Sequence, residues 1–348
     1  MSAHALPRIA IYGAGSVGGY LAARLHEHAR ITCIGRRRVI DAWRIHGGLD
    51  WSDLQGAHEH VATRDLELQV DPFAAAKAHL VLVTVKSSAT ETVARELAPV
   101  IAPGVPVVSF QNGLHNAAIL REALPGRPVL AGMVPFNVLQ RIPGDFHQGS
   151  GGELMVEAHD SLKAFLPVFE ASGLALMPRT DMPAVLAAKL LLNLNNAINA
   201  LANVPLKEEL SQRDWRRCLA LAQREAIAVF AAAGIHPAKL TPLPPPWLPR
   251  VLEMPDTWFR RLASRLLAID PVARSSMWED LERGRPTEVD AINGEVVRLA
   301  EQHHVAAPVN ARLVALLHEA EQGRRSWSAQ ELLDELQSTP LGYSSAAP

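Results

Sequence analysis

Three glycines near the start of the chain have the spacing GxGxxG: Gly13, Gly15 and Gly18. They follow the apolar run IAIY and precede a stretch of helical character, and in this context the motif is typical of binding to the pyrophosphate of a dinucleotide. The first glycine allows a tight turn, the second lets backbone N–H groups approach the anion, and the third allows close packing of helix on strand. We therefore predict that Gly13, Gly15, Ser16, Val17 and Gly18 contact a dinucleotide cofactor.

The residues about 20 positions after the first glycine indicate which dinucleotide binds, because an NAD-selective site carries Asp or Glu there to hold the ribose 2′-hydroxyl. This chain has Gly35 followed by Arg36, Arg37 and Arg38. A guanidinium makes bidentate, charge-assisted hydrogen bonds to a 2′-phosphate. We predict NADPH as the cofactor and Arg36, nearest the strand end, as the phosphate contact. The residues leave open whether Arg37 or Arg38 makes it instead.

Polar residues follow two further apolar runs. Lys86 comes after LVLVTV, and Asn112 comes shortly after VVSF. Ligands of open parallel sheets bind beyond the carboxyl ends of the strands, so we predict that Lys86 contacts the cofactor and that Asn112 contacts both cofactor and substrate. Taken alone, each residue is equally compatible with a surface position, and Asn112-Gly113 is also a turn dipeptide.

A lysine and several asparagines share one predicted helix in the second half of the chain. A helical period places Lys189, Asn193, Asn196 and Asn203 on one face. Asparagine is a poor helix former, so five of them within residues 193–203 require an explanation. A polar cleft is one explanation, and a buried hydrogen-bond network between helices is the other. In a partly desolvated cleft Lys189 can have a lowered pKa and act as a general acid, with Asn193 and Asn196 contacting substrate.

Two more polar positions occur further along the chain. SSMWED contains Ser276, and after a Gly/Pro break TEVD contains Thr287, a credible helix N-cap, and Glu288 in the first helical turn. The helix dipole favours an ionised Glu288, which could hold a lysine ammonium or a substrate hydroxyl. Simple capping explains Glu288 equally well.

The elements that must position these residues fall into two groups. Short β-rich runs at 8–12, 30–34, 80–85, 106–110 and 128–134 alternate with helical stretches, which predicts a doubly wound, mostly parallel α/β sheet. From residue 182 the pattern becomes Ala- and Leu-rich and helical, including 185–203, 215–233 and 258–267. We predict a nucleotide-binding domain over 1–180, a helical substrate and catalytic domain over 181–325, and a frayed tail over 326–348.

Composition excludes several classes of protein. With 34 basic and 36 acidic residues the formal net charge is −2, which disfavours binding to nucleic acid. Cys33 and Cys218 form no CxxC pair, no leader or uncharged span of about 18 apolar residues is visible, and the histidines show no HExxH pattern. We expect a cytoplasmic protein without a metal, a membrane segment or a nucleic-acid partner. The sequence leaves open whether the protein forms a homodimer.

In sequence order these motifs resemble those of the ketopantoate reductase family (2-dehydropantoate 2-reductase) from residue 8 to about 322. The motifs are GAGSVG, the strand-end arginine, VTVK, QNG, KLLLN, SSMWED and TEVDAING. The resemblance implies a Rossmann domain, an all-α domain similar to that of 6-phosphogluconate dehydrogenase, and an active site in the cleft between them. It also implies NADPH-dependent reduction of 2-dehydropantoate to (R)-pantoate in pantothenate and coenzyme A biosynthesis, with hydride delivered to the C2 carbonyl.

The family's roles carry over to five positions. By this resemblance Lys189 is the general acid, Asn112 and Asn193 line the site, and Ser276 binds the carboxylate of the 2-oxo acid. Glu288 resembles the acidic residue that contacts the lysine or the substrate hydroxyl.

Two departures from the family pattern concern the substrate. Well-known members carry asparagines eight residues after the lysine and three residues before the serine, where this chain has Ala197 and Ala273. These positions bear on how the hydroxyl end of the substrate is held. The sequence therefore leaves open a reductase of another branched 2-oxo acid and, as a different class, a non-enzymatic NADPH-binding sensor, although a sensor needs no proton donor.

Overall fold

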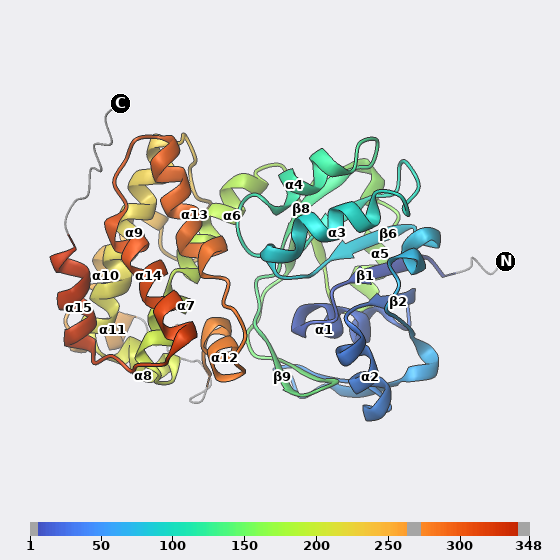
Figure 1. Ribbon diagram of the computed structural model, residues 1–348, viewed down its shortest axis with the longest axis horizontal. Helices are drawn as coiled ribbons and strands as arrows, with labels where there is room; N and C mark the ends of the chain where they lie inside the picture. Colours follow the sequence, from blue (N-terminus) through green and yellow to red (C-terminus); the bar gives the residue numbers. More distant parts are fainter. Residues whose placement is uncertain (1–5, 263–272, 340–348) are drawn as a thin grey trace. The chain divides into compact units, whose positions relative to one another are not determined.

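The computed structural model describes residues 6–262 and 273–339 (Figure 1). The chain divides into two compact units, Met1–Met182 and Pro183–Pro348. We had predicted the boundary between residues 180 and 181.

The first unit is built on an eight-stranded sheet with the order β12-β11-β8-β7-β6-β1-β2-β5. Neighbouring strands run parallel except for the antiparallel pair β8 and β11, so the predicted mostly parallel sheet is confirmed. The strands are β1 Arg8–Tyr12, β2 Arg30–Ile34, β5 Glu67–Gln69, β6 Leu80–Val83, β7 Val107–Ser109, β8 Val129–Met133, β11 Leu154–Glu157 and β12 Leu176–Arg179.

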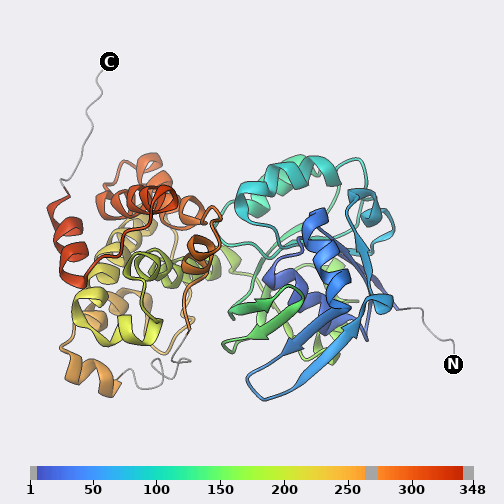
Figure 2. The ribbon, with the colours of Figure 1, turned by 60° about the horizontal axis from the view of Figure 1, so that its bottom comes forward.

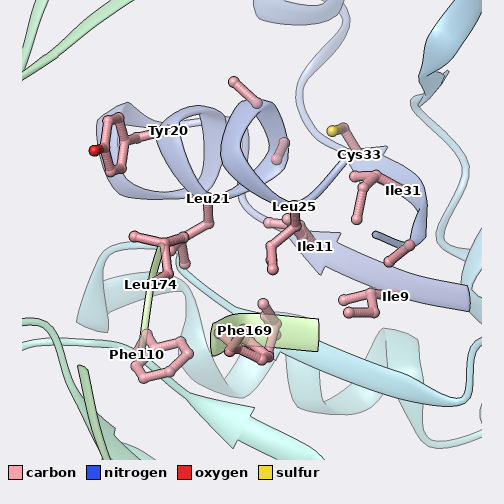
Figure 3. Close-up of a cluster of buried hydrophobic side chains, with 14 of the residues drawn as sticks. Ile9, Ile11, Tyr20, Leu21, Leu25, Ile31, Cys33, Phe110, Phe169 and Leu174 are labelled. Atoms are coloured by element: carbon pink, nitrogen blue, oxygen red, sulfur yellow. The ribbon is translucent and has the colours of Figure 1, made fainter. Parts of the chain in front are cut away.

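Alternating side chains of the central strands fill two separate cores. On β1, Ile9 and Ile11 point to one face of the sheet, and Ala10 and Tyr12 point to the other. Both faces are buried, which explains why these strands read as continuous apolar runs. Figure 3 shows the first core, where Leu25 of α1 lies over Ile11.

Helices cover both faces of this sheet. Residues of α1 and α5 belong to the core of Ile9 and Ile11, and residues of α3 and α4 belong to the core of Ala10 and Tyr12, so the sheet is doubly wound. The α-helices of the unit are α1 Ser16–Leu25, α2 Arg37–His46, α3 Thr90–Leu97, α4 Asn116–Ala123 and α5 Leu166–Ala171. Short 3-10 helices occur at Thr63–Asp65, Pro72–Lys77, Ser87–Ala89 and Asp160–Leu162.

A second, four-stranded sheet was not predicted. It has the order β4-β3-β10-β9, and Figure 2 shows the blue hairpin of β3 and β4 beside the green β9 and β10. Its strands are β3 Gly48–Ser52, β4 His58–Ala62, β9 Val138–Ile142 and β10 Asp145–Gln148. Most of its side chains are only partly buried, and Phe146 packs edge-on against Trp43, 103 residues earlier in the chain. Such long-range packing leaves no local apolar pattern to detect.

In its described residues the second unit is entirely helical, as predicted. Its α-helices are α6 Met182–Asn193, α7 Asn195–Ala202, α8 Leu206–Ser211, α9 Arg213–Ala232, α10 Leu248–Leu252, α11 Asp256–Leu262, α12 Ser276–Glu282, α13 Val289–Gln302, α14 Pro308–Gln322 and α15 Ala329–Ser338, with a 3-10 turn at Pro245–Trp247. The part of the predicted helix 258–267 that follows residue 262 lies outside the described residues. The stretch Met182–Ala202 is long and apolar enough to cross a membrane, but most of its apolar part is buried within the structure, and we assign it to the core.

The prediction of a frayed tail over 326–348 is wrong for the helix α15. Ser328 and Glu331 form a capping box at its start, and Leu332, Leu333 and Leu336 are buried. These leucines form an apolar stripe along the helix, which packs against α9 and α14. The polar residues around them hid this stripe in the sequence. Residues 340–348 lie outside the described part.

The docking of α15 makes a testable prediction. Leu333 is fully buried, so Leu333→Ala should lower the free energy of unfolding by about 2–5 kcal/mol through lost burial and the cavity left behind. Denaturant unfolding measures this change. Gln337→Ala, on the exposed side of the same helix, is the matched control and should have little effect. Equal stability of both variants would mean that α15 does not dock in solution.

Candidate active site

The glycine-rich turn lies at the carboxyl end of β1 and leads directly into α1. Gly13 has a φ of +128°, which side chains disfavour, and its N–H donates to the Ile34 carbonyl at 2.9 Å. A Cβ on Gly18 would lie 1.9 Å from the Gly13 carbonyl oxygen and 2.6 Å from Thr84 Oγ1. Thr84 Oγ1 also donates to the Gly13 carbonyl at 2.8 Å. Gly13 and Gly18 are therefore required by the packing of the turn itself.

Gly15 differs from its two neighbours in the motif. A Cβ on Gly15 would meet nothing within 4 Å, so the backbone there borders open space rather than packed protein. Gly15 is the N-cap of α1, and among the described residues this cap has no side-chain hydrogen bond and the first turn has no acidic residue. A helix N-terminus of this kind attracts an anion. The residues present therefore fit a dinucleotide pyrophosphate at Gly15, Ser16 and Val17.

Arg36, the predicted phosphate contact, and its alternatives Arg37 and Arg38 lie at the start of α2. Arg36 is the N-cap, and the side chains of Arg36, Arg37 and Arg38 are exposed and have no hydrogen bond or ion pair within the described residues. Three cations at a helix N-terminus oppose the helix dipole, at a cost of about 0.3–1 kcal/mol each, and a bound phosphate would remove this cost.

Gly35, which sequence reasoning did not assign, brings this segment to the glycine-rich turn. A Cβ on Gly35 would lie 2.4 Å from the Cβ of Ala14. A side chain there would therefore push the start of α2 away from the turn, and only glycine lets the two segments meet. The signal in the sequence was a glycine directly after a strand, which is too common to single out.

Lys86 and Asn112 follow β6 and β7, which are paired parallel neighbours, so both residues lie at the same edge of the sheet. Both are partly buried. Ser87 Oγ donates to the Asn112 carbonyl at 2.9 Å, and Asn116 Nδ2 donates to the same oxygen at 2.5 Å. The turn after β6 is thereby bound to the turn after β7, which brings the two predicted residues to neighbouring positions.

A buried polar network that we did not predict supports these turns. Thr90 Oγ1 lies 2.7 Å from Asn116 Oδ1, and Gln111 Nε2 donates to that hydroxyl at 2.7 Å. Ser109 Oγ in turn donates to Gln111 Oε1 at 2.9 Å. These partners are 2 to 26 residues apart in the sequence, so the network has no local signature.

In the helical unit Lys189 and Asn193 lie one turn apart on α6, and both side chains are partly buried. Burial lowers the pKa of Lys189 from its ordinary value of 10.5 to about 8. The ammonium is thus still mostly protonated at neutral pH but gives up its proton far more readily than an exposed lysine. This is the property required of a general acid.

Two of the predicted substrate residues come together across 80 positions of sequence. Asn196 Nδ2 on α7 donates to Ser276 Oγ on α12 at 3.4 Å, a long hydrogen bond between two partly or fully exposed side chains. The preceding residue, Ser275, is the N-cap of α12, and its hydroxyl lies 3.1 Å from the Asn196 carbonyl. Ser276 and Asn196 thus form a small polar pair on the surface of the helical unit.

Of the two explanations for the asparagine-rich segment, the structure confirms a buried hydrogen-bond network for part of it. Asn193 and Asn196 are partly exposed, whereas Asn195 and Asn199 are buried and belong to a hydrogen-bond network that includes the buried carboxyl of Glu209. The helical period places the two partly exposed asparagines and the two buried ones on different sides of the segment. Glu209 was not singled out from the sequence, because a glutamate in a charged segment, KEEL, gives no sign of complete burial.

Glu288 is placed differently from our prediction. The helix α13 begins at Val289, so Glu288 is its N-cap and does not lie in the first turn, and Thr287 precedes the cap. The Thr287 backbone N–H and hydroxyl both donate to Glu321 Oε1, at 2.8 Å each. The Thr287 hydroxyl also accepts the Val289 N–H at 3.3 Å, so Thr287 still contacts the start of α13. The Glu288 side chain is partly buried.

One group of possible metal ligands occurs among the described residues: His26, Glu27 and Glu59 offer ligand atoms within 4.8 Å of one another. His26 Nδ1 lies 2.8 Å from the Ala23 carbonyl, and its Nε2 lies 3.5 Å from Glu59. Capping of α1 and an ion pair account for this arrangement, which the spacing of the histidines in the sequence did not reveal because Glu59 is distant.

Comparison with known proteins identifies a family that this chain matches. Residues 9–161 match the model for ketopantoate reductase PanE/ApbA, and residues 181–321 match the model for its C-terminal part. The 2-dehydropantoate 2-reductase of Halobacterium salinarum is 31% identical over 257 residues, covering 72% of this chain and 78% of that protein.

This chain belongs to the ketopantoate reductase family. As a member it is an oxidoreductase acting on CH–OH groups and their carbonyl counterparts.

Solved structures of the same fold include other reductases. A PanE/ApbA family ketopantoate reductase from Ralstonia eutropha is 28% identical and superimposes with a TM-score of 0.77, covering 91% of this chain and 99% of that one. D-mandelate dehydrogenase, solved with NADH and anilino(oxo)acetate, is 21% identical with a TM-score of 0.73, covering 90% and 98%. The latter likeness establishes the fold of this ketopantoate reductase family member and nothing about its substrate.

The glycine geometry separates cofactor binding from stability in this family member. Gly15→Ala should leave the melting temperature nearly unchanged and weaken dinucleotide binding by at least about tenfold, because its methyl group enters the space beside the turn. Gly18→Ala should instead destabilise the fold, because its methyl group collides with the Gly13 carbonyl. Thermal melting and fluorescence titration with NADPH measure the two effects. Unimpaired NADPH binding by Gly15→Ala would place the pyrophosphate elsewhere.

Proposed function

We propose that the protein reduces 2-dehydropantoate to (R)-pantoate with NADPH, as a cytoplasmic step of pantothenate and coenzyme A biosynthesis. The observation that carries this proposal is the environment of Lys189. In a member of the ketopantoate reductase family, a partly buried lysine with a pKa near 8 lies one helical turn from Asn193. The same α6–α7 segment carries Asn196, whose amide donates to Ser276 of α12.

The N-terminal unit would hold the cofactor. The turn of Gly13, Gly15 and Gly18 would receive the pyrophosphate at the start of α1, and Arg36 would bind the 2′-phosphate at the start of α2. Lys86 and Asn112, at the ends of β6 and β7, would contact the ribose or nicotinamide portion. NADPH supplies a hydride to the C2 carbonyl carbon when bound.

Lys189 would supply the proton for the reduced carbonyl. Reduction at C2 leaves negative charge on the carbonyl oxygen, and an ammonium at hydrogen-bond distance stabilises that charge and then transfers its proton to it. Burial has brought the pKa of Lys189 to about 8, close to neutral pH. A general acid is most effective when its pKa lies near the pH at which it operates. Glu288 would hold either the lysine ammonium or the hydroxyl of the substrate.

Neutral hydrogen-bonding groups would orient the substrate. The Ser276 hydroxyl oxygen and the Asn196 amide nitrogen are 3.4 Å apart. Both groups are uncharged and can donate hydrogen bonds to a carboxylate. Asn193 and Asn112 can each donate and accept, which suits the carbonyl and hydroxyl groups of 2-dehydropantoate.

A second candidate is the reduction of another branched 2-oxo acid. It is favoured by Ala197 and Ala273, where the resemblance led us to expect asparagines. Ala197 is fully buried, so this position offers no polar group to a substrate hydroxyl. The reaction and the proton donor would be the same, and only the pocket for the substrate's distal end would differ.

Initial rates of NADPH oxidation with a panel of 2-oxo acids test the proposed function. We expect the highest kcat/KM with 2-dehydropantoate and a strong preference for NADPH over NADH. Turnover with a different branched 2-oxo acid alone would favour the second candidate. Tight NADPH binding without any turnover would contradict both and favour a sensor.

Removal of the proposed acid should slow the chemical step. Lys189→Ala should reduce kcat by about 10²- to 10⁴-fold, equivalent to about 3–5 kcal/mol of transition-state stabilisation. In the wild-type protein kcat/KM for reduction should fall as pH rises through about 8, because deprotonated Lys189 has no proton to give. Lys207→Ala, an exposed lysine of the same unit, is the control. An alkaline decline that persists in Lys189→Ala would remove Lys189 from the mechanism.

Reversal of charge at the start of α2 should change the cofactor preference. Arg36→Asp should weaken NADPH binding by about ten- to a hundredfold and NADH binding much less, because a carboxylate repels the 2′-phosphate. Dissociation constants for both cofactors measure this, with Arg37→Asp and Arg38→Asp compared in parallel. A change in preference confined to one of those two variants would move the phosphate contact there.

A further inference from the structure

Glu209 is a carboxyl buried in the middle of the helical unit. It lies on α8, is 0% exposed, and accepts a hydrogen bond from Asn199 Nδ2 at 2.5 Å. Burial raises the pKa of Glu209 from 4.5 to about 8, against the opposing effect of hydrogen bonds from Asn195 and Asn199. Glu209 is therefore neutral at pH 7, and it has no part in the mechanism described above.

Asn199 connects this carboxyl to the segment that carries Ser276. Its Nδ2 donates to Glu209 and to the Val204 carbonyl at 3.0 Å, and its Oδ1 accepts the Ser275 backbone N–H at 2.8 Å. Asn199 is itself 0% exposed. Because two acceptors face the amide nitrogen and one donor faces the amide oxygen, the amide group has only one satisfactory orientation. Glu209 thereby helps to present the oxygen to Ser275.

The start of α12 is bound to α7 and α8 by further hydrogen bonds. The Ser275 hydroxyl donates to the Asn196 carbonyl at 3.1 Å, and the Leu206 N–H donates to the Ala273 carbonyl at 2.9 Å. The helix α7 packs against both α8 and α12 within the helical unit (Figure 1). Ser276, the next residue along the chain, is exposed beside Asn196.

We propose that Glu209 and Asn199 are positioning residues for the substrate: they fix the start of α12 on α7 so that Ser276 and Asn196 present one defined pair of donors to the carboxylate of the 2-oxo acid. This inference rests on the proposed function, in which Ser276 and Asn196 bind that carboxylate. Neither positioning residue touches the substrate. Their loss therefore changes how the substrate is held, without removing the proton donor or any cofactor contact.

The role requires a hydrogen-bond acceptor for Asn199 at position 209. Glu209→Gln keeps an oxygen for Asn199 and stays neutral, whereas Glu209→Met fills a similar volume but offers Asn199 no hydrogen-bond partner of that kind. The exposed neighbour Glu208→Ala is a control for changes in the charge of α8. Asn199→Leu tests the same connection from its other side and keeps the inference falsifiable if Glu209→Met does not fold.

The experiment measures steady-state kinetics and amide hydrogen exchange on the full-length protein. In Glu209→Met we expect the KM for 2-dehydropantoate to rise by about tenfold, with kcat and the KM for NADPH changed by less than about threefold. Exchange in the peptide covering residues 273–280 should accelerate, because the Asn199 amide that accepts the Ser275 N–H is no longer held by Glu209. Glu209→Gln should largely restore both readouts, and Glu208→Ala should resemble the wild-type protein.

Three results would overturn the inference. These are an unchanged KM for the 2-oxo acid in folded Glu209→Met or Asn199→Leu, a Glu209→Gln variant as impaired as Glu209→Met, or unchanged exchange over 273–280. Failure of the proposed function is recognised separately. If the wild-type protein reduces no 2-oxo acid, the exchange measurement alone still decides whether Glu209 fixes this segment.

Discussion

The close packing of backbone around Gly13 is the constraint on which the nucleotide-binding unit depends. The Gly13 carbonyl accepts the Thr84 hydroxyl and lies where any side chain on Gly18 would have to be, so β1, β6 and α1 meet at a point with no room for a Cβ. This packing places the N-terminus of α1 at the carboxyl end of the central strands. Gly35, pressed against Ala14, brings the arginines of α2 to the same place. The residues that we propose to bind the cofactor are thus positioned by contacts among backbone atoms and small side chains.

In the helical unit, desolvation has opposite effects on two titratable groups. Burial disfavours the charged form of any group, so it lowers the pKa of Lys189 and raises the pKa of Glu209, both to about 8. The consequences differ because one group is a base and the other an acid. Lys189 is still charged at pH 7 but holds its proton weakly, which suits proton donation. Glu209 is already neutral, which suits a permanent place inside a network of amides.

The asparagines of α6 and α7 fall into two sets, one partly exposed and one buried. Outward-facing Asn193 and Asn196 offer amides that can bind a ligand, and inward-facing Asn195 and Asn199 satisfy buried polar groups. A helix that was apolar on its buried side could pack equally well, but it could not hold the start of α12 by a hydrogen bond to a backbone N–H. The buried network therefore links packing to the geometry of Ser276.

Local patterns in the sequence determined much of the fold and the positions of several candidate site residues. The strands β1 and β2, the glycine-rich turn, the strand-end arginines and the change to a helical second half all follow from apolar periodicity and turn chemistry between neighbours in the chain. The family followed from the order of short motifs. Tertiary structure alone decided the second sheet, the docking of α15, the start of α13 at Val289, and the network that joins Glu209, Asn199 and Ser275. These features depend on partners tens of residues apart, and burial, which sets the pKa values of Lys189 and Glu209, exists only once those partners have met.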